Sequence, residues 1–379
     1  GRGCSMTGRL TTAWACLASC CLALSACAGG ASAVKEPAAS TASTVSTKAP
    51  RPTTASSRST PTPTPTPEPP RPATPSGTIT LAFAGDANAF SRGGASTTLG
   101  LGEAGDLLAS ADFAMVNLET ALAASDKGLV GQQKRYHFLT DSAFPEMLQR
   151  EGVDLVSLAN NHAMDFGVPG LERTLAVRDA SDLPMIGVGR TTSEAFAPWT
   201  GTVSGRRLSV FVGNDILEPQ LDWRPRDGQP GVAMIKTAKG LAALVDGVRE
   251  AREADPNRLI VVYVHWGIDY SVCTSSRQHE VAQALADAGA TVVVGTHAHR
   301  VQRTTLVGDT LVAYGLGNFN FFSDRTVTRE TGVLTVTIPR TGAPSYDWAP
   351  GVIVDGRPVL LTGDERDAAL ARYATLPRC

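Results

Sequence analysis

From about residue 77 onward, short apolar runs alternate with segments whose apolar residues recur at helical spacing, and this alternation narrows the choice of fold more than any other feature. The apolar runs are 79–84, 113–116, 154–159, 208–212, 259–264, 291–294 and 311–314, and the helical segments are 143–150, 169–179, 240–254 and 278–288. Strands that alternate with helices predict an α/β domain. Two later runs, 333–338 and 352–361, have no helix between them, so they either pair antiparallel or form a second sheet.

Five of these apolar runs stop at polar side chains that are able to do chemistry. The side chains are Asp86, then Asn117 and Glu119, then Asn160, Asn161 and His162, then His265, and finally His297 and His299. In α/β proteins the functional crevice lies at the carboxyl ends of the strands. If the five strands belong to one sheet, all five clusters converge on one edge of it.

The residue types in these clusters suit divalent metal ions. Imidazole and carboxylate groups bind borderline divalent ions, and one carboxylate can bridge two of them. His297 and His299 are two residues apart, so in extended backbone their side chains point to the same side. Two ions about 3.5–4 Å apart would position a water and stabilise an in-line displacement at phosphorus.

Each cluster also has a purely structural interpretation. Asp86 follows a glycine, which is typical of a turn or a helix cap. His265 beside Trp266 is typical of a hydrogen-bonded core residue. The shared position at strand ends favours the metal interpretation. For His137, near a loop, and His279, inside a predicted helix, we expect structural roles.

The N-terminal segment is typical of an exported protein. Met6-Thr7-Gly8-Arg9 is basic, an apolar run covers 10–24, and Leu24-Ser25-Ala26-Cys27 ends it. We expect translation to start at Met6 and residues 6–26 to form a secretory signal, because the run is shorter than the about 20 residues of a comfortable membrane span. The last four residues resemble the bacterial lipobox, which predicts a lipid on Cys27 and an extracytoplasmic protein anchored to the cell membrane. The alternatives are a plain secretory signal or a buried helix.

Residues 27–77 are predicted to form a disordered linker after the lipidated cysteine. They are mostly Ala, Ser, Thr and Pro, with Pro and Thr alternating over 61–67. Such a segment buries too little apolar surface to fold, and its prolines favour a semi-rigid spacer. The net charge of −2, without a dense Lys/Arg stripe, argues against nucleic-acid binding. In an oxidising compartment Cys273 and Cys379 can pair, although two cysteines alone do not prove a bridge.

Six short motifs follow one another along the predicted domain. They are Gly85-Asp86, Asn117-Leu118-Glu119, Ser157-Leu158-Ala159-Asn160-Asn161-His162 with Asp165-x-Gly167, His265-Trp266-Gly267-x-Asp269-Tyr270, Gly295-Thr296-His297-Ala298-His299 and Tyr314-x-Leu316-Gly317-Asn318-Phe319. In this order they resemble the CapA family of poly-γ-glutamate capsule biosynthesis proteins. The resemblance covers residues 78–325, and residues 326–379 are expected to complete the same domain with strands and a helix.

The CapA family is similar in fold to calcineurin-like metallophosphoesterases. The resemblance therefore implies a layered α/β/β/α sandwich that binds divalent ions, with Mn, Fe and Zn as candidates. Asp86 and His299 would bind a first ion, Asn161, His265 and His297 a second, and Glu119 would bridge them. His162 and Asp165 are the candidate catalytic residues, with His162 as general acid or electrostatic helper. Asn117, Asn160, Asp269 and Asn318 are further candidates for the site.

The sequence also departs from the phosphoesterase pattern. Asn88 stands where those enzymes usually have a histidine, and Asn117-x-Glu119 replaces an aspartate that follows a glycine. The first ion is therefore expected to bind weakly or not at all, and activity does not carry over from the fold. The resemblance implies a role in synthesis or export of an anionic surface polymer, with that polymer or other polymer-synthesis components as partners. The alternative is an extracytoplasmic metal-dependent hydrolase, acting on a phosphoester or a polymer bond and unrelated to capsule.

Overall fold

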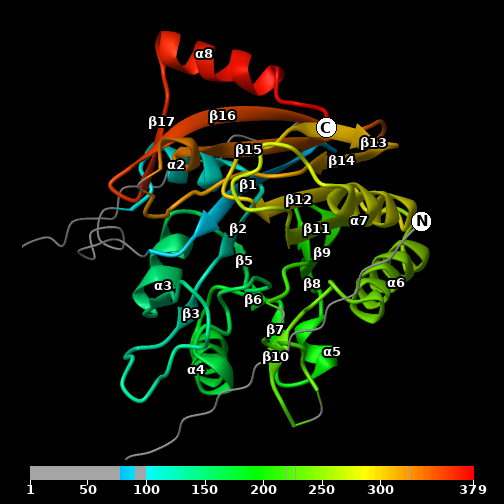
Figure 1. The fold of residues 1–379 in the computed structure, drawn as a ribbon. Coiled ribbons are helices and arrows are strands. Elements are labelled where there is room, and N and C mark those ends of the chain that lie inside the picture. The colour runs from blue at the N-terminus through cyan, green and yellow to red at the C-terminus, as the bar shows by residue number, and fades with distance from the viewer. Residues whose placement is uncertain (1–76, 90–99, 219, 227, 324) are drawn as a thin grey trace, which may run out of the picture. The chain divides into compact units, whose positions relative to one another are not determined.

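The computed structural model describes residues 77–89, 100–218, 220–226, 228–323 and 325–379. The predicted signal sequence, Cys27 and the linker up to residue 76 lie outside the described residues. Two β-sheets face each other in the described fold, and helices lie on their outer sides (Figure 1). The predicted layered α/β/β/α sandwich is confirmed.

The larger sheet has seven strands in the order β17-β16-β15-β1-β2-β5-β6. Their bounds are β1 Ile79–Ala87, β2 Phe113–Leu118, β5 Leu155–Ser157, β6 Met185–Ile186, β15 Glu330–Ile338, β16 Ser345–Val354 and β17 Arg357–Leu360. The strands β1, β2, β5 and β6 run parallel, whereas β15, β16 and β17 pair antiparallel beside β1. The last strands of the chain thus lie in the same sheet as the first.

The second sheet has six strands in the order β13-β14-β12-β11-β9-β8. Their bounds are β8 Trp199–Val203, β9 Arg206–Asn214, β11 Leu259–Trp266, β12 Val292–His297, β13 Thr304–Val307 and β14 Thr310–Ala313. Its four inner strands are parallel, and the edge strands β8 and β13 are antiparallel to their neighbours. The strands that end in the polar clusters therefore belong to two sheets. The condition that all five belong to a single sheet is not met.

Helices cover the outer faces of both sheets. Their bounds are α2 Glu103–Ser110, α3 Ala143–Arg150, α4 Gly167–Ala180, α5 Thr192–Ala195, α6 Ala238–Ala254, α7 Ser276–Asp287 and α8 Gly363–Ala374, with a 3₁₀ turn at Thr326–Thr328. Two small pairs, β3 Ala121–Leu122 with β4 Leu139–Thr140 and β7 Val188–Gly189 with β10 Gly231–Val232, join the loops. Figure 1 shows α6 and α7 beside the six-stranded sheet and α3 and α4 on the opposite side of the molecule.

One predicted strand was wrong in its extent. The run 352–361 is not a single strand, because β16 ends at Val354 and β17 begins at Arg357. Asp355 and Gly356 connect them with φ values of 50° and 80°. Asp-Gly is the residue pair that a two-residue hairpin turn with two positive φ angles prefers, so the sequence did contain the signal for a turn.

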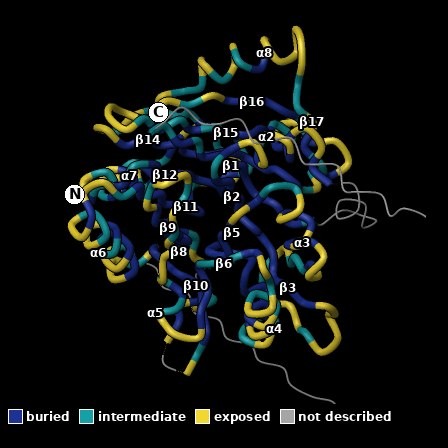
Figure 2. The backbone as a smooth tube through the Cα atoms, turned by 180° about the vertical axis from the view of Figure 1, so that it is seen from behind, coloured by how far each residue is buried: buried dark blue, intermediate teal, exposed yellow. Residues whose placement is uncertain are grey.

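Strand β11 shows how the alternation of side chains divides the core. Val261 and Tyr263 pack in the cluster between the sheets, whereas Val262 and Val264 pack in a second cluster with residues of α6 and α7. A strand that is buried on both faces is apolar at every position, which explains its continuous apolar run. Figure 2 shows the same contrast, with buried strands inside and helices that expose one face.

Two further contacts tie the described fold together. The hydroxyl of Tyr263 in β11 donates a hydrogen bond to the carbonyl of Ala84 in β1 at 2.5 Å, so it links the two sheets. Cys273 and Cys379, whose pairing the sequence left open, form a disulfide across a separation of 106 residues. Among the described residues, none of the helices is long and apolar enough to span a membrane.

Candidate metal centre

The six predicted metal ligands come together where the two sheets face each other. Asp86 lies near the end of β1, and Glu119 and Asn161 follow β2 and β5. His265 and His297 lie at the ends of β11 and β12 in the other sheet, and His299 follows two residues later. All except His299, which is partly exposed, are buried. Parallel strands thus deliver their carboxyl ends to one place from two sheets.

The backbone at this place is held in unusual conformations. His297 has a φ of 93° and His299 a φ of 53°, which non-glycine residues rarely adopt. The backbone N–H of His297 donates to Asp86 Oδ2 at 3.2 Å, so the conformation connects the two sheets. Gly85 is required next to Asp86, because a Cβ atom there would lie 1.9 Å from the carbonyl oxygen of Gly317. Such strained positions gather at functional sites.

The ligand atoms form two groups, each small enough to hold one ion. One group is Glu119, His265 and His297, and the other is Asp86, Glu119 and His299, with the ligand atoms of each group within 4.8 Å of one another. Glu119 belongs to both groups. The members are those that the resemblance assigns to two ions, and Asn161 Oδ1 lies 2.8 Å from Nε2 of His265 beside the first group.

Glu119 is the residue that most needs a partner. Both of its carboxylate oxygens are buried and accept no hydrogen bond within the described residues, although Oε1 lies 3.2 Å from His265 Nε2. Burial and then the nearby Asp86 carboxylate raise the pKa of Glu119 well above its usual value. An unpaired carboxylate in the interior is costly, and a divalent cation between the two groups would offset that cost. The residues present therefore fit divalent ions.

The histidines of the site differ in the direction of their pKa shifts. Burial lowers the pKa of His265 to about 4 and the pKa of His297 well below its usual value, so both rings are neutral at pH 7. Neutral imidazole is the form that binds metal ions. Burial lowers the pKa of His299 too, but the carboxylates of Glu119 and Asp86 outweigh it, so the net shift is upward.

His162 lies beside the ligand groups in a tightly packed setting. Its Nδ1 lies 2.7 Å from Asp165 Oδ2, and its ring stacks on Phe138 with centroids 4.1 Å apart. Lys134 Nζ lies 2.7 Å from Asp165 Oδ1, so the carboxylate is paired on both sides. Burial lowers the pKa of His162 to about 4, which leaves the ring neutral with its Nδ1 proton on the Asp165 side. Asp165 is fully buried, so it positions His162 and does not itself contact a bound substrate.

The remaining candidates orient the ligands or lie at the rim. Asn117 donates from Nδ2 to Asp86 Oδ1 at 2.7 Å, and Asn160 donates to Asn117 Oδ1 at 3.2 Å. Asn318 Oδ1 lies 2.7 Å from Nδ1 of His299. Asp269 reaches Nε2 of His297 at 3.1 Å with 57 % of its side chain exposed, so it stands at the mouth of the site. Outer partners of this kind hold metal ligands in position.

A cavity of about 430 Å³ opens over the two ligand groups. Its lining includes residues that the strand-end pattern missed, namely Lys134, Arg135, Tyr136, Phe138, Phe321, Phe322 and Arg325. The guanidinium of Arg325 lies 4.5 Å from the ring centre of Tyr270, and that of Arg135 lies 5.0 Å from Tyr136. These residues lie in loops, where no strand pattern marks their place. The cavity therefore has metal ligands at its floor and aromatic and cationic residues at its rim, together with the acidic residues Glu218 and Asp269.

Residues 77–323, more than half of the chain, match the protein family described as "Bacterial capsule synthesis protein PGA_cap". The chain belongs to this family. The six ordered motifs predicted membership of this capsule-synthesis family, and the match confirms that prediction. The matched range contains every predicted metal ligand and ends before β15.

Three curated relatives of this chain are informative. It is 27% identical over 260 residues to the "PGA biosynthesis protein CapA" of Bacillus subtilis (strain 168), covering 67% of this chain and 65% of the relative. It is 26% identical over 262 residues to the "Capsule biosynthesis protein CapA" of Bacillus anthracis, covering 67% and 61%. A "Probable polyglutamine synthesis accessory protein" of Mycobacterium tuberculosis is 28% identical over 213 residues, with 55% of each chain covered. The chain thus spans less than two thirds of the length of these relatives.

Two solved structures are distantly similar to this family member. The protein TT1561 of Thermus thermophilus has a TM-score of 0.40 at 12% identity, with 69% of this chain and 99% of that chain covered. The sulfate thiohydrolase SoxB of Thermus thermophilus, in complex with glycerol, has a TM-score of 0.42 at 14% identity, with 79% and 61% covered. Similarity at this level carries no conclusion about activity.

Proposed function

We propose that this chain is an extracytoplasmic lipoprotein of capsule-type polymer synthesis or export, which binds an anionic γ-linked glutamate polymer in its metal-site cavity. Membership of the capsule-synthesis family and the names of the Bacillus relatives support the polymer. The observation that most supports a metal site is the buried Glu119 carboxylate, which two ligand groups share. Divalent ions held by these groups would supply the positive charge that attracts polymer carboxylates.

The rim of the cavity supports an anionic ligand as well. Arg135 and Arg325 line the mouth and lie over the rings of Tyr136 and Tyr270. A guanidinium stacked on an aromatic ring keeps its planar set of donors available for a carboxylate. A polymer with one carboxylate per unit can therefore contact the floor and the rim of the cavity at the same time.

A second candidate function is a metal-dependent hydrolase that cleaves a phosphoester or a polymer bond. The paired His162 and Asp165 favour it, because Asp165 fixes the proton of His162 on Nδ1 and leaves Nε2 as the acceptor. A neutral His162 at pH 7 suits the uptake of a proton from an attacking water. A role for His162 as general acid would require it to take up a proton first.

Metal content and polymer binding of the purified full chain test the proposal. We expect wild type to bind divalent ions and γ-linked glutamate polymer, and His297→Ala to lose both. His279→Ala is the matched control, because His279 contacts Thr274 and lies outside both ligand groups. A metal-loaded wild type that binds no polymer would contradict the polymer role.

Turnover separates the two candidate functions. If the chain is a hydrolase, His162→Ala should lower metal-dependent cleavage of a phosphoester or of the polymer by about 10²–10⁴-fold, while the metal content stays unchanged. If it only binds polymer, metal-loaded wild type cleaves neither substrate and His162→Ala changes no rate.

Fractionation of cells tests the proposed anchor. Wild type should sediment with membranes and carry a lipid, because Cys27 is the expected attachment site. Cys27→Ser should move the chain to the soluble or secreted fraction. Membrane association that survives this substitution would contradict lipidation at Cys27.

A further inference from the structure

A second and larger cavity lies at the opposite ends of the same strands. Its volume is about 870 Å³, and Arg206 at the start of β9, Leu259 at the start of β11 and Ile338 at the end of β15 line it. The metal ligands His265 and His297 lie at the other ends of β11 and β12. The cavity is thus separate from the metal centre, and nothing in the proposed function uses it.

Cationic side chains outnumber acidic ones in this cavity. The arginines are Arg206, Arg207, Arg252, Arg258 and Arg340, and the acidic residues are Asp255, Asp287 and Asp309. A single buried carboxylate, Asp255, serves two of the arginines, at 2.8 Å from Arg207 and 3.6 Å from Arg258. Asp287 accepts a hydrogen bond from Gln283 at 2.8 Å. The acidic residues therefore leave part of the positive charge without a balancing carboxylate.

Two of the arginines are held in place by neutral groups. Arg206 donates from one Nη to the carbonyls of Ile338 and Pro339 at 3.0 and 3.1 Å. Arg252 donates to the carbonyls of Gly289 and Pro256 at 2.8 and 2.7 Å. Within the described residues neither guanidinium forms an ion pair with a carboxylate. Carbonyl oxygens fix the orientation of these cations but do not cancel their charge, so each keeps an attraction for an anion.

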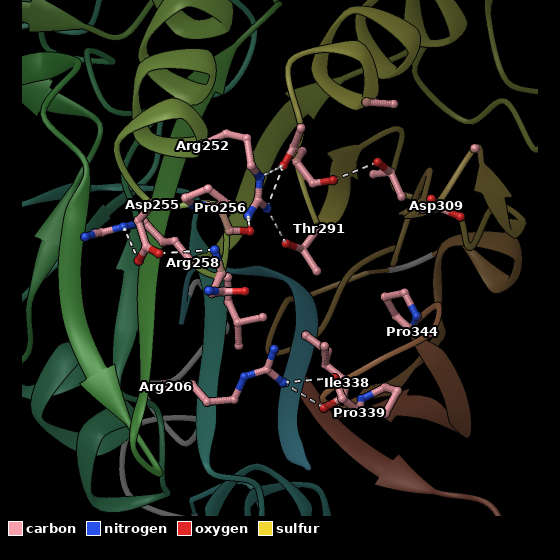
Figure 3. A pocket seen from close by; sticks show the side chains of 18 of the residues that line it. Arg206, Arg252, Asp255, Pro256, Arg258, Thr291, Asp309, Ile338, Pro339 and Pro344 are labelled. Atoms are coloured by element: carbon pink, nitrogen blue, oxygen red, sulfur yellow. Dashed lines mark hydrogen bonds and ion pairs between the residues drawn. The ribbon is translucent and has the colours of Figure 1, made fainter. Parts of the chain in front are cut away.

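Two of the arginines, Arg206 and Arg340, repel each other. Burial and then the charge of Arg340 lower the pKa of Arg206, whereas burial lowers the pKa of Arg252 against the opposing effect of Asp255. Figure 3 shows Arg252 and Arg206 at separate places on the cavity wall, with Arg258 between them. One small ion cannot contact all of these side chains. A ligand with several anionic groups can, and it would relieve the repulsion between the cations.

We propose that this arginine-lined cavity binds an oligoanion that carries phosphate or carboxylate groups, with Arg206, Arg252 and Arg340 as its contacts. The volume lies within the range of ligand cavities. Guanidinium groups match both kinds of anion with paired hydrogen bonds. This inference does not rest on the proposed function of the metal centre.

Calorimetric titration of the full chain with tripolyphosphate and with γ-linked triglutamate tests the proposal. We expect wild type to bind at least one of them, more weakly as salt increases, and the tighter probe identifies the source of the anion. Arg340→Glu should weaken binding by at least about 10-fold. Lys239→Glu, an equal charge change on the exposed surface of α6, should change it by less than about 2-fold.

Two more variants keep the test decisive. Arg206→Lys retains a cation and should weaken binding less than Arg340→Glu, and thermal unfolding checks that both remain folded. Arg325→Glu alters the metal cavity and should leave tripolyphosphate binding unchanged. The proposal is overturned if wild type binds neither probe, if Arg340→Glu matches Lys239→Glu, or if only Arg325→Glu removes binding.

Discussion

The two ends of strands β11 and β12 carry opposite chemistry. At the carboxyl ends, His265 and His297 meet Glu119, whose buried carboxylate accepts no hydrogen bond within the described residues. At the amino ends, Arg206 and Arg252 are held by carbonyl oxygens and keep their charge. One end therefore suits cations and the other suits anions.

The length of the strands keeps these two ends independent. β11 has 8 residues, which at about 3.3 Å per residue separates its ends by roughly 25 Å. Charges in solvent are largely screened beyond about 8–10 Å at physiological salt. One sheet can thus hold binding sites of opposite sign, and a substitution at one end should leave the ligand of the other end unaffected.

The largest expected effect concerns the disulfide between Cys273 and Cys379. Cys273 follows the rim residues Asp269 and Tyr270, and its bond to Cys379 encloses 106 residues. Replacing both cysteines by serine should lower the free energy of unfolding by about 2–5 kcal/mol, measured by urea denaturation. Tripolyphosphate binding at the arginine-lined cavity should be unchanged in the folded variant. If tripolyphosphate binding falls as much as metal binding does in this variant, the two ends are coupled.

The next effect separates the ligands of the two ends. His297→Ala should weaken metal binding by at least about 10-fold, because even partners outside the ligand set change affinity by that much. The same variant should bind tripolyphosphate as wild type does, and Arg340→Glu should keep its metal. Equilibrium dialysis of both variants with Mn²⁺ or Zn²⁺ measures this. Metal loss in Arg340→Glu would break the separation.

The smallest effect concerns the contact between the sheets. Tyr263→Phe removes the hydrogen bond to the Ala84 carbonyl and should lower stability by about 1 kcal/mol. Tyr346→Phe is the matched control and should have a smaller effect, because the Tyr346 ring in β16 makes only an edge-to-face contact with Tyr373 of α8. Equal urea midpoints for the two variants would argue that the Tyr263 hydroxyl does not join the sheets.

The sequence predicted the metal-binding end far better than the arginine-lined end. His265, His297 and Asp86 lie at the ends of apolar strands, so the local sequence around each of them indicates a site residue. Arg206, Arg258 and Arg340 stand at strand starts or beyond a strand end and are separated by 134 residues from first to last. Only tertiary packing brings them together, so no local pattern could predict their cavity.

Sheet pairing was the other limit of sequence reasoning. The runs 113–116 and 259–264 are both uniformly apolar, because each strand is buried on both faces. Their sequences therefore do not indicate which sheet each strand joins. The motif resemblance, and not the alternation of elements, implied two sheets. Lys134 escaped notice for a different reason, since its loop has no periodic pattern and only the fold places it against Asp165.

The divalent-ion content of the purified full chain, measured by elemental analysis after loading with Mn²⁺, Fe²⁺ or Zn²⁺, tests the central claim most directly. Because Glu119 belongs to both ligand groups, we predict that wild type binds divalent ions and that Glu119→Gln loses more metal than His297→Ala, which belongs to one group. His279→Ala should retain as much metal as wild type. A wild-type chain that binds none of these ions, or a Glu119→Gln chain that retains as much metal as wild type, would contradict the shared-carboxylate centre.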